Sequence, residues 1–319
     1  MKRSSLALLA LFACSLQAHA QIQPARPIRL IVPFAPGGGS DVTARLIGPK
    51  ITEAVGATVI IDNRPGASGI VGTEIVKRAT PDGHTLVLID TAHTVNKILL
   101  PSTPYNPIQD FSPISLVATA PMTLVVHPAV PANSATEFVN LARAQPGKLT
   151  MGSAGAGTSS HLGGELLRLA TNVQWTHVPY KGTGPAMAEL AGGQLQGFVG
   201  PLTGPLALIK AGKLKALAVA SETRAKLLPD VATLAEQGIS GVIASNWYGI
   251  LAPAGVPPKT VAALAAGIAN GVAANDTRDR FAALALEPKA STQKEFYALL
   301  HEETKKWREV IAKANIRIE

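Results

Sequence analysis

The chain has 319 residues, of which 47% are hydrophobic and 16% are charged, with a formal net charge of +8 and a single cysteine. This composition excludes a disordered chain and gives enough apolar residues for a sizeable core. The basic residues are scattered among acids and only 4% of residues are aromatic, so we expect no nucleic-acid binding.

The first twenty residues have the pattern of an export signal. Met1-Lys2-Arg3 is basic, Leu6–Phe12 is apolar but too short to span a bilayer, and Ala18-His19-Ala20 is a small-x-small cleavage site. We therefore predict an exported protein that is cleaved after Ala20. A lipoprotein anchored at Cys14 is the competing interpretation, which the Ala-x-Ala site disfavours.

Cleavage at that site would remove the only cysteine and lower the net charge to +6. Disulfides and cysteine-bound metals are then excluded, so a mature chain of about 299 residues must be stabilised by its core, typically as two domains.

The first element predicted after the signal is a buried strand, Ile28–Val32, which leads through Pro33–Asp41 into a helix, Val42–Val55. The three glycines of Pro-Phe-Ala-Pro-Gly-Gly-Gly-Ser-Asp allow a sharp turn with outward amides, and Ser40 is expected to cap the helix. A helix N-terminus with free amides attracts anions, although an ordinary βα turn has the same pattern. Pro49 predicts a kink or two short helices.

This order of strand, glycine turn and helix recurs twice. Strand Thr58–Asp62 leads through Asn63–Gly69 into helix Gly69–Arg78, and strand Lys148–Met151 leads through Gly152–His161 into another helix. Because the carboxyl ends of parallel strands meet at one edge of a sheet, we predict that the three turns open on the same side.

Between the second and third turns, strand Thr85–Ile89 is predicted to end in a polar stretch at the same edge, Thr91–Thr94. His93 is a candidate ligand contact there, although a lone histidine at a strand end is more often structural. Pro101–Pro113 is predicted to be an ordered, irregular connection.

The later elements follow from apolar runs and periodicity. The predicted strands are Met122–His127, Thr176–Pro179, Gly197–Val199 and Lys215–Ala220, and the predicted helices are Ser134–Ala144, Pro185–Ala191, Lys259–Ala274, Arg278–Leu284 and Gln293–Ala314. Gly238–Tyr248 is interpreted as a return crossing between two lobes.

The glycine turns lack the groups that catalysis needs. No lysine follows the glycines, as a nucleotide P-loop requires, and Gly155-Ala-Gly157 does not continue to a dinucleotide fingerprint. Gly66-Ala-Ser68-Gly69 has the wrong register for a nucleophile elbow, and His301-Glu302-Glu303 does not reach a second histidine. We therefore predict a binding protein with no cofactor, no metal and no catalytic residue. A secreted hydrolase is the alternative; it would use Ser40, Ser68, Ser153 or Ser159.

Several segments, in order and spacing, resemble the Bug/TctC proteins, the periplasmic receptors of tripartite tricarboxylate transporters. The resemblance extends from about Pro27 to the C-terminus, and its most specific segments are Pro33–Arg45, Asn63–Ala67, Pro81–Leu86, Gly152–Gly157, His177–Gly182 and Trp247–Gly255. It implies an α/β, two-lobed periplasmic-binding-protein fold (type II-like), with parallel-rich sheets flanked by helices and a hinge between the lobes. The implied boundaries are 24–121 and 247–319 for lobe 1 and 122–246 for lobe 2.

The resemblance also implies a ligand site between the lobes and a monomeric receptor that presents a small organic carboxylate to transporter membrane subunits. A sensory partner of a histidine kinase is an alternative use. The residues carried over are Phe34, Gly37, Gly38, Ser40 and Asp41 in the first turn, Ala67, Ser68 and Gly69 in the second, Thr91 and His93 after the next strand, and Ser153, Ala154, Gly157, Thr158 and His161 across the cleft.

One departure from the family concerns Gln196. Members of the family often carry an acidic residue after the Gly-Gly-Gln of the second lobe and another shortly beyond, where this chain has Gln196 and then Phe198-Val199-Gly200. On the assumption that such an acid would face the ligand, its absence favours a purely anionic or aromatic carboxylate over one with an amino group.

Overall fold

A computed structural model describes residues 22–242, 244–314 and 316. The predicted signal peptide, its cleavage after Ala20 and Cys14 lie outside these residues. Within them, no helix is long and apolar enough to cross a membrane.

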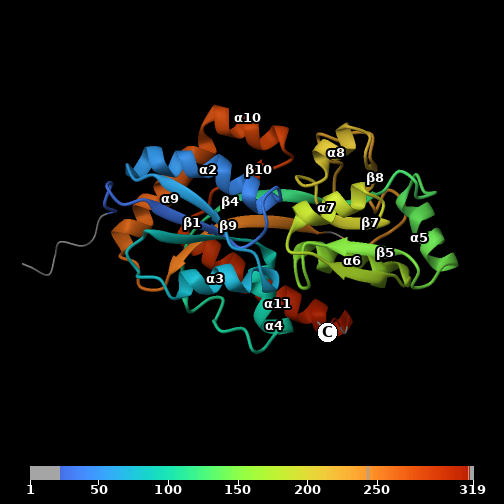
Figure 1. The fold of residues 1–319 in the computed structure, drawn as a ribbon, viewed down its shortest axis with the longest axis horizontal. Coiled ribbons are helices and arrows are strands. Elements are labelled where there is room, and N and C mark those ends of the chain that lie inside the picture. Colours follow the sequence, from blue (N-terminus) through green and yellow to red (C-terminus); the bar gives the residue numbers. More distant parts are fainter. Residues whose placement is uncertain (1–21, 243, 315, 317–319) are drawn as a thin grey trace, which may run out of the picture.

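The described chain forms a mixed α/β fold with a curled sheet that joins two lobes (Figure 1). The strand order is β2-β1-β3-β9-β4-β7-β5-β6, with β8 and β10 paired to β4. Two long strands, β4 (Phe111–Val126) and β9 (Ser245–Pro253), pair antiparallel through the middle of the molecule. β4 pairs with β9 along its first part and with β7 and β8 along its last part, so one strand belongs to both lobes.

In the first lobe the outer strands are parallel. β1 (Ile28–Val32) pairs with β2 (Val59–Asn63) and β3 (Thr85–Ile89), and β3 then meets β9 antiparallel. The helices of this lobe are α2 (Gly39–Val55), α3 (Ile70–Lys77), α4 (Thr91–Leu99), α9 (Pro258–Ala273), α10 (Asn275–Ala283) and α11 (Gln293–Ala314), and the short β10 (Glu287–Pro288) follows α10.

The second lobe repeats this arrangement around its own core. β5 (Thr150–Ser153) pairs in parallel with β6 (Thr176–Pro179) and β7 (Gly197–Pro201). The remaining elements of the lobe are α5 (Ala135–Ala144), α6 (Ser159–Thr171), α7 (Thr183–Ala191), α8 (Leu206–Lys210) and β8 (Lys215–Val219). A core cluster around Met122, Phe138 and Leu167 fills this lobe, whereas the core of the first lobe gathers around Leu30, Ile47 and Leu264.

Four helical or strand predictions differ from the structure. The prediction that Ser40 caps the first helix is wrong, because α2 begins at Gly39 and its N-cap is Gly38. α2 also continues through Pro49 as one helix, so the predicted alternative of two short helices is wrong. Thr91–Thr94 is not a strand end but the first turn of α4, capped by Asp90. The strand predicted from Met122 begins already at Phe111, inside the segment predicted to be irregular.

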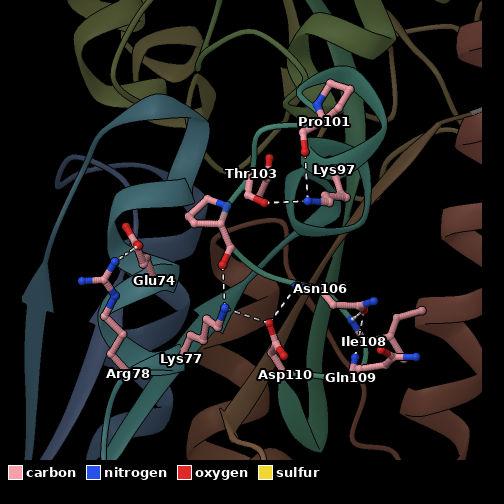
Figure 2. A network of polar contacts seen from close by, with 11 residues as sticks. Glu74, Lys77, Arg78, Lys97, Pro101, Thr103, Asn106, Ile108, Gln109 and Asp110 are labelled. Atoms are coloured by element: carbon pink, nitrogen blue, oxygen red, sulfur yellow. Dashed lines mark hydrogen bonds and ion pairs between the residues drawn. The ribbon is translucent and has the colours of Figure 1, made fainter.

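The proline-rich connection before β4 is held against α3 and α4 by two lysines (Figure 2). Lys77 donates to the Pro104 carbonyl at 2.6 Å, and Lys97 donates to the carbonyls of Pro101 and Thr103 at 2.9 and 2.7 Å. The connection is therefore ordered, as the sequence predicts.

An apolar cluster joins the two lobes beside the sheet. Val95 of α4 and Leu162 of α6 pack with Trp307 and Ile311 of α11. Figure 1 shows α11 and α4 next to each other, with α6 above the end of α11. The C-terminal helix of the first lobe thus contacts the second lobe directly.

Candidate functional site

The loops after the parallel strands of both lobes meet at a small, enclosed cavity of about 20 Å³. Its lining combines the start of α2, the starts of α6 and α7, and strand β9. The residues that line it are Phe34, Gly38, Gly39, Ser40, Asp90, Ala154, Thr158, Ser159, Ser160, Thr183, Pro201, Asn246 and Tyr248.

Three helices begin at this cavity without a side-chain cap. The N-cap residues of α2, α6 and α7 are Gly38, Thr158 and Gly182, and none of these makes a capping hydrogen bond with its side chain. The first amides of a helix have no partner within the helix, and the helix dipole adds a partial positive charge there. Three such ends around one cavity favour an anionic ligand.

The lobes touch across the cavity, so the structure is closed. The amide of Ala35 donates to the Lys181 carbonyl at 3.1 Å, which joins the first turn to the loop before α7. A Cβ on Gly184 would lie 2.5 Å from the Pro36 oxygen, and a Cβ on Gly155 would lie 2.9 Å from Ser68 Oγ. Glycine at these positions lets the two backbones approach closely.

The sequence-predicted residues fall into three groups. The cavity brings together Phe34, Gly38, Ser40, Ala154 and Thr158. A second, smaller cavity next to it is lined by Ser68, Gly69 and His93, and it shares Phe34 and Asp90 with the first. Outside both linings lie Gly37, Asp41, Ala67, Thr91, Ser153, Gly157 and His161.

Most of the residues outside the cavities have partners that explain their positions. The Asp41 carboxylate accepts from the Gly37 amide at 3.1 Å and from Arg45 and Asn63, so it fastens the first turn to α2 and β2. Burial opposes its ionisation, but these hydrogen bonds outweigh burial and lower the pKa of Asp41. Thr91 donates to Asn246 Oδ1 at 3.1 Å.

The third glycine turn uses several of its own amides internally. Ser160 Oγ accepts from the Ala154 amide at 2.8 Å, and His161 Nδ1 accepts from the Gly157 amide at 3.0 Å. The His161 ring stacks on His177 with centroids 4.1 Å apart. Thr158, Ser159 and Ser160 line the cavity, but the Thr158 hydroxyl donates to the Gly155 carbonyl at 2.7 Å and lies 3.0 Å from Ser160 Oγ, so these two hydroxyls also take part in the turn's own hydrogen bonds.

Ser153 and His177 have the distance of a nucleophile and its base, with Oγ and Nε2 2.6 Å apart. Ser153 is nevertheless fully buried and outside the cavity lining. Its Oγ also accepts from the Gly155 amide at 3.1 Å. The pair thus fixes the shape of the turn between β5 and α6.

His93 is placed away from the main cavity by its aromatic neighbours. Its Nε2 donates to the Pro107 carbonyl at 2.7 Å, and its ring packs on Tyr105 and Phe111. It ties α4 to the proline-rich connection, as a structural histidine would.

Asp90 is the main residue of the cavity that sequence reasoning missed. It follows β3 as the N-cap of α4, and its Oδ1 accepts from the Ala92 amide at 3.0 Å. The Ser40 hydroxyl donates to the same carboxyl group. Burial raises the pKa of Asp90 to about 7, against the opposing effect of these two hydrogen bonds. The signal that could have found it is its position directly after a buried strand.

Tyr248 and Asn246 of β9 complete the cavity and were not predicted. Tyr248 is 1% exposed, and its hydroxyl is hydrogen-bonded to Asn246. The register Ile89↔Gly249 places Asp90 beside Tyr248, although more than 150 residues separate them in sequence. Burial, and then the nearby Asp90, raise the pKa of Tyr248.

Gln196, the residue at which this chain departs from the family pattern, does not line the cavity. Gln196 Oε1 accepts from the amide and the hydroxyl of Thr150, both at 2.8 Å. It pairs β5 with the segment before β7 and is outside the cavity lining. The assumption that an acid at this position would face the ligand is therefore wrong for this chain.

A much larger groove lies elsewhere on the described part of the chain. It lies between the 221–227 segment and α10 and measures about 1420 Å³. It is broad, open to solvent and lined by charged side chains of both signs, such as Arg224, Glu222 and Asp279. The cavity between the lobes is much smaller but enclosed, and three helices without a side-chain cap begin at it.

The profile of the tripartite tricarboxylate transporter family receptor matches residues 43–316, which include nearly all of both lobes. The chain belongs to this receptor family. A UPF0065 protein of Pseudomonas sp. is 38% identical over 289 residues, covering 90% of this chain and 86% of the relative. BugT of Bordetella pertussis is 33% identical over 301 residues, covering 94% of this chain and 92% of BugT.

Solved receptors share the fold of this TctC-family chain. The periplasmic binding protein BugD has a TM-score of 0.90 and 33% identity, covering 93% of this chain and all of BugD. An R. palustris protein solved with adipate has a TM-score of 0.90 and 30% identity, covering 93% of this chain and 99% of that protein. MatC of Rhodopseudomonas palustris, solved with malate, has a TM-score of 0.87 and 31% identity, covering 91% of this chain and all of MatC. The predicted family and the two-lobed binding-protein fold are confirmed.

Gly39 tests how tightly the cavity wall is packed. A Cβ added there would lie 2.0 Å from the Tyr248 hydroxyl, so Gly39→Ala is expected to destabilise the fold by about 1–3 kcal/mol in urea unfolding. Gly164→Ala on α6 is the matched control, because a Cβ there meets nothing within 4 Å and alanine favours a helix by about 1 kcal/mol. Equal stability of Gly39→Ala and the wild type would contradict this packing.

Proposed function

We propose that this protein is an exported receptor that binds a small organic carboxylate between its lobes and presents it to transporter membrane subunits. The observation that carries the proposal is the enclosed cavity at three uncapped helix N-termini. Relatives of the same family solved with malate and adipate support the ligand class.

The proposed ligand contacts are those sequence-predicted residues that line the main cavity, together with Asp90, Thr183, Asn246 and Tyr248. The lobe boundaries 24–121, 122–246 and 247–319 fall within β4, which pairs with strands of both lobes, and near the start of β9. We propose these crossings as the hinge, because a closed lobe arrangement gains ligand contacts that an open one lacks.

We also propose that the protein catalyses no reaction, is a monomer and lies in the periplasm after cleavage behind Ala20. The observation that favours a hydrolase is the short distance between Ser153 and His177. The burial of Ser153 speaks against attack on a substrate in the cavity. Turnover of carboxylate esters that is lost in Ser153→Ala would favour the hydrolase instead.

Calorimetric titration against a panel of carboxylates, with malate and adipate included, tests the receptor. We expect one ligand per chain and a raised melting temperature, since a ligand at 100 times its Kd stabilises the folded state by about 2.7 kcal/mol. No binding and no thermal shift with any carboxylate would overturn the proposal.

A further inference from the structure

Asp90 is a buried carboxyl group in a cavity that is otherwise built to attract anions. It lines both the main cavity and the smaller one beside it, and it is only 8% exposed. Ser40 of α2 and the Ala92 amide of α4 each donate to it. Two hydrogen-bond donors and three helix N-termini thus surround a group of the same charge as the proposed ligand.

None of the described residues that line either cavity is a lysine or an arginine. An ionised Asp90 beside a ligand carboxylate would therefore place two like charges in an enclosed space with no cation between them. Two like charges a few ångströms apart in a low dielectric repel each other by several kcal/mol, so one of the two groups must become neutral.

The buried carboxyl of Asp90 is the group better suited to hold a proton. Its surroundings already raise its pKa to about 7 before a second negative charge arrives. A free carboxylate in the ligand has an ordinary pKa near about 4, so it stays ionised at neutral pH. A protonated Asp90 still accepts from Ala92 and Ser40 and gains one O–H that it can donate.

We propose that this receptor takes up one proton from solvent with its carboxylate ligand, and that the proton resides on Asp90, which then donates a hydrogen bond to the ligand. The inference rests on the proposed function, because it concerns the same site.

Few other groups in this region could titrate in its place. β9 contributes the amide of Asn246 and the hydroxyl of Tyr248. Burial raises the pKa of Tyr248, so this hydroxyl keeps its proton near pH 7. α2 contributes Ser40, α4 contributes Thr91 and the Ala92 amide, and the opposite lobe contributes the hydroxyls of 158–160. In the smaller cavity His93 faces the same region, and burial lowers its pKa to about 4, so it stays neutral near pH 7.

Calorimetry at several pH values tests the proposal with malate, adipate and the other panel carboxylates as probes. Above about pH 7 the wild-type Kd should rise by about tenfold per pH unit, and below about pH 7 it should be constant. Repeating the titration in two buffers of different ionisation enthalpy should show uptake that approaches one proton per ligand on the alkaline side.

Asp90→Asn removes the titration and keeps a donor, and asparagine also caps helices well, so α4 keeps its N-cap. We expect its Kd to change less than about twofold over the same pH range and to lie near the acidic wild-type value. Asp41→Asn is the matched control: its carboxylate is bound by Arg45 and Asn63 outside the cavities, so it should keep the wild-type pH slope.

The outcomes separate the two proposals. If no carboxylate binds at any pH, the receptor proposal fails and this inference fails with it. Binding without proton uptake and without a pH slope overturns this inference alone. Proton release with tighter binding of an amino carboxylate at high pH also overturns it, because Asp90 would then act as an ionised partner for a ligand ammonium group.

Discussion

Replacing Gly184 by alanine is expected to weaken carboxylate binding by about 10–100-fold while the ligand-free protein melts at the wild-type temperature or slightly above it. A Cβ on Gly184 of α7 would lie 2.5 Å from the Pro36 oxygen. The nearest atoms to it all belong to Pro36 and Gly37 of the other lobe. The clash therefore exists only when the lobes close, and overpacking of this kind costs about 1–3 kcal/mol.

Small-angle scattering and calorimetry check this result together. The wild type should compact when ligand is added, whereas Gly184→Ala should remain extended and bind weakly. Gly164→Ala, in the same lobe but away from the cleft, should bind as the wild type does. Wild-type affinity in Gly184→Ala would show that closure in solution does not bring Gly184 against Pro36.

The local parts of the fold could be predicted from sequence because their signals are local. β1, the second glycine turn and α11 follow directly from apolar runs, glycines and helical periodicity. α4 could not be predicted in this way, because its first turn, Thr91–Thr94, is mostly polar. The residues that pack on α4 come from α11, from the segment before β4 and from the start of β4. Tertiary contacts override weak local preference there.

The composition of the cavity depends on contacts between distant segments. Asp90 meets Tyr248 only because β9 returns antiparallel beside β3, and no local pattern in either segment indicates that register. The glycine turns could be found from the sequence because a turn with positive φ favours glycine, and Gly37 and Gly155 adopt positive φ in the structure. Sequence reasoning missed the contribution of β9, which adds Asn246 and Tyr248 to the wall.

Two sets of buried titratable groups then act in opposite directions. Burial raises the pKa of Asp90. Burial lowers the pKa of the three histidines His93, His161 and His177 to about 4 each. The nearby Arg168 also lowers the pKa of His161, and His161 also lowers the pKa of His177. The inferred proton uptake favours binding below about pH 7, whereas the histidines make the fold less stable when protons are abundant. The two effects together favour operation just below neutral pH.

The fold is expected to lose stability as the pH falls from about 6.5 towards 4, and His93 should account for up to about 3 kcal/mol of that loss. Its pKa is about 4 when folded and about 6.5 when unfolded, so between these values the unfolded chain binds a proton that the folded chain does not. Each pH unit in this window removes about 1.4 kcal/mol, and above it the contribution is constant.

Urea unfolding at a series of pH values measures this slope in the wild type and in His93→Gln. Glutamine keeps a donor for the Pro107 carbonyl but does not titrate, so its stability should fall less steeply below about pH 6.5. Asp90 affects both proteins equally and cancels in the difference. An unchanged slope in His93→Gln would contradict the assignment, because the proton that destabilises the fold would then bind at other groups.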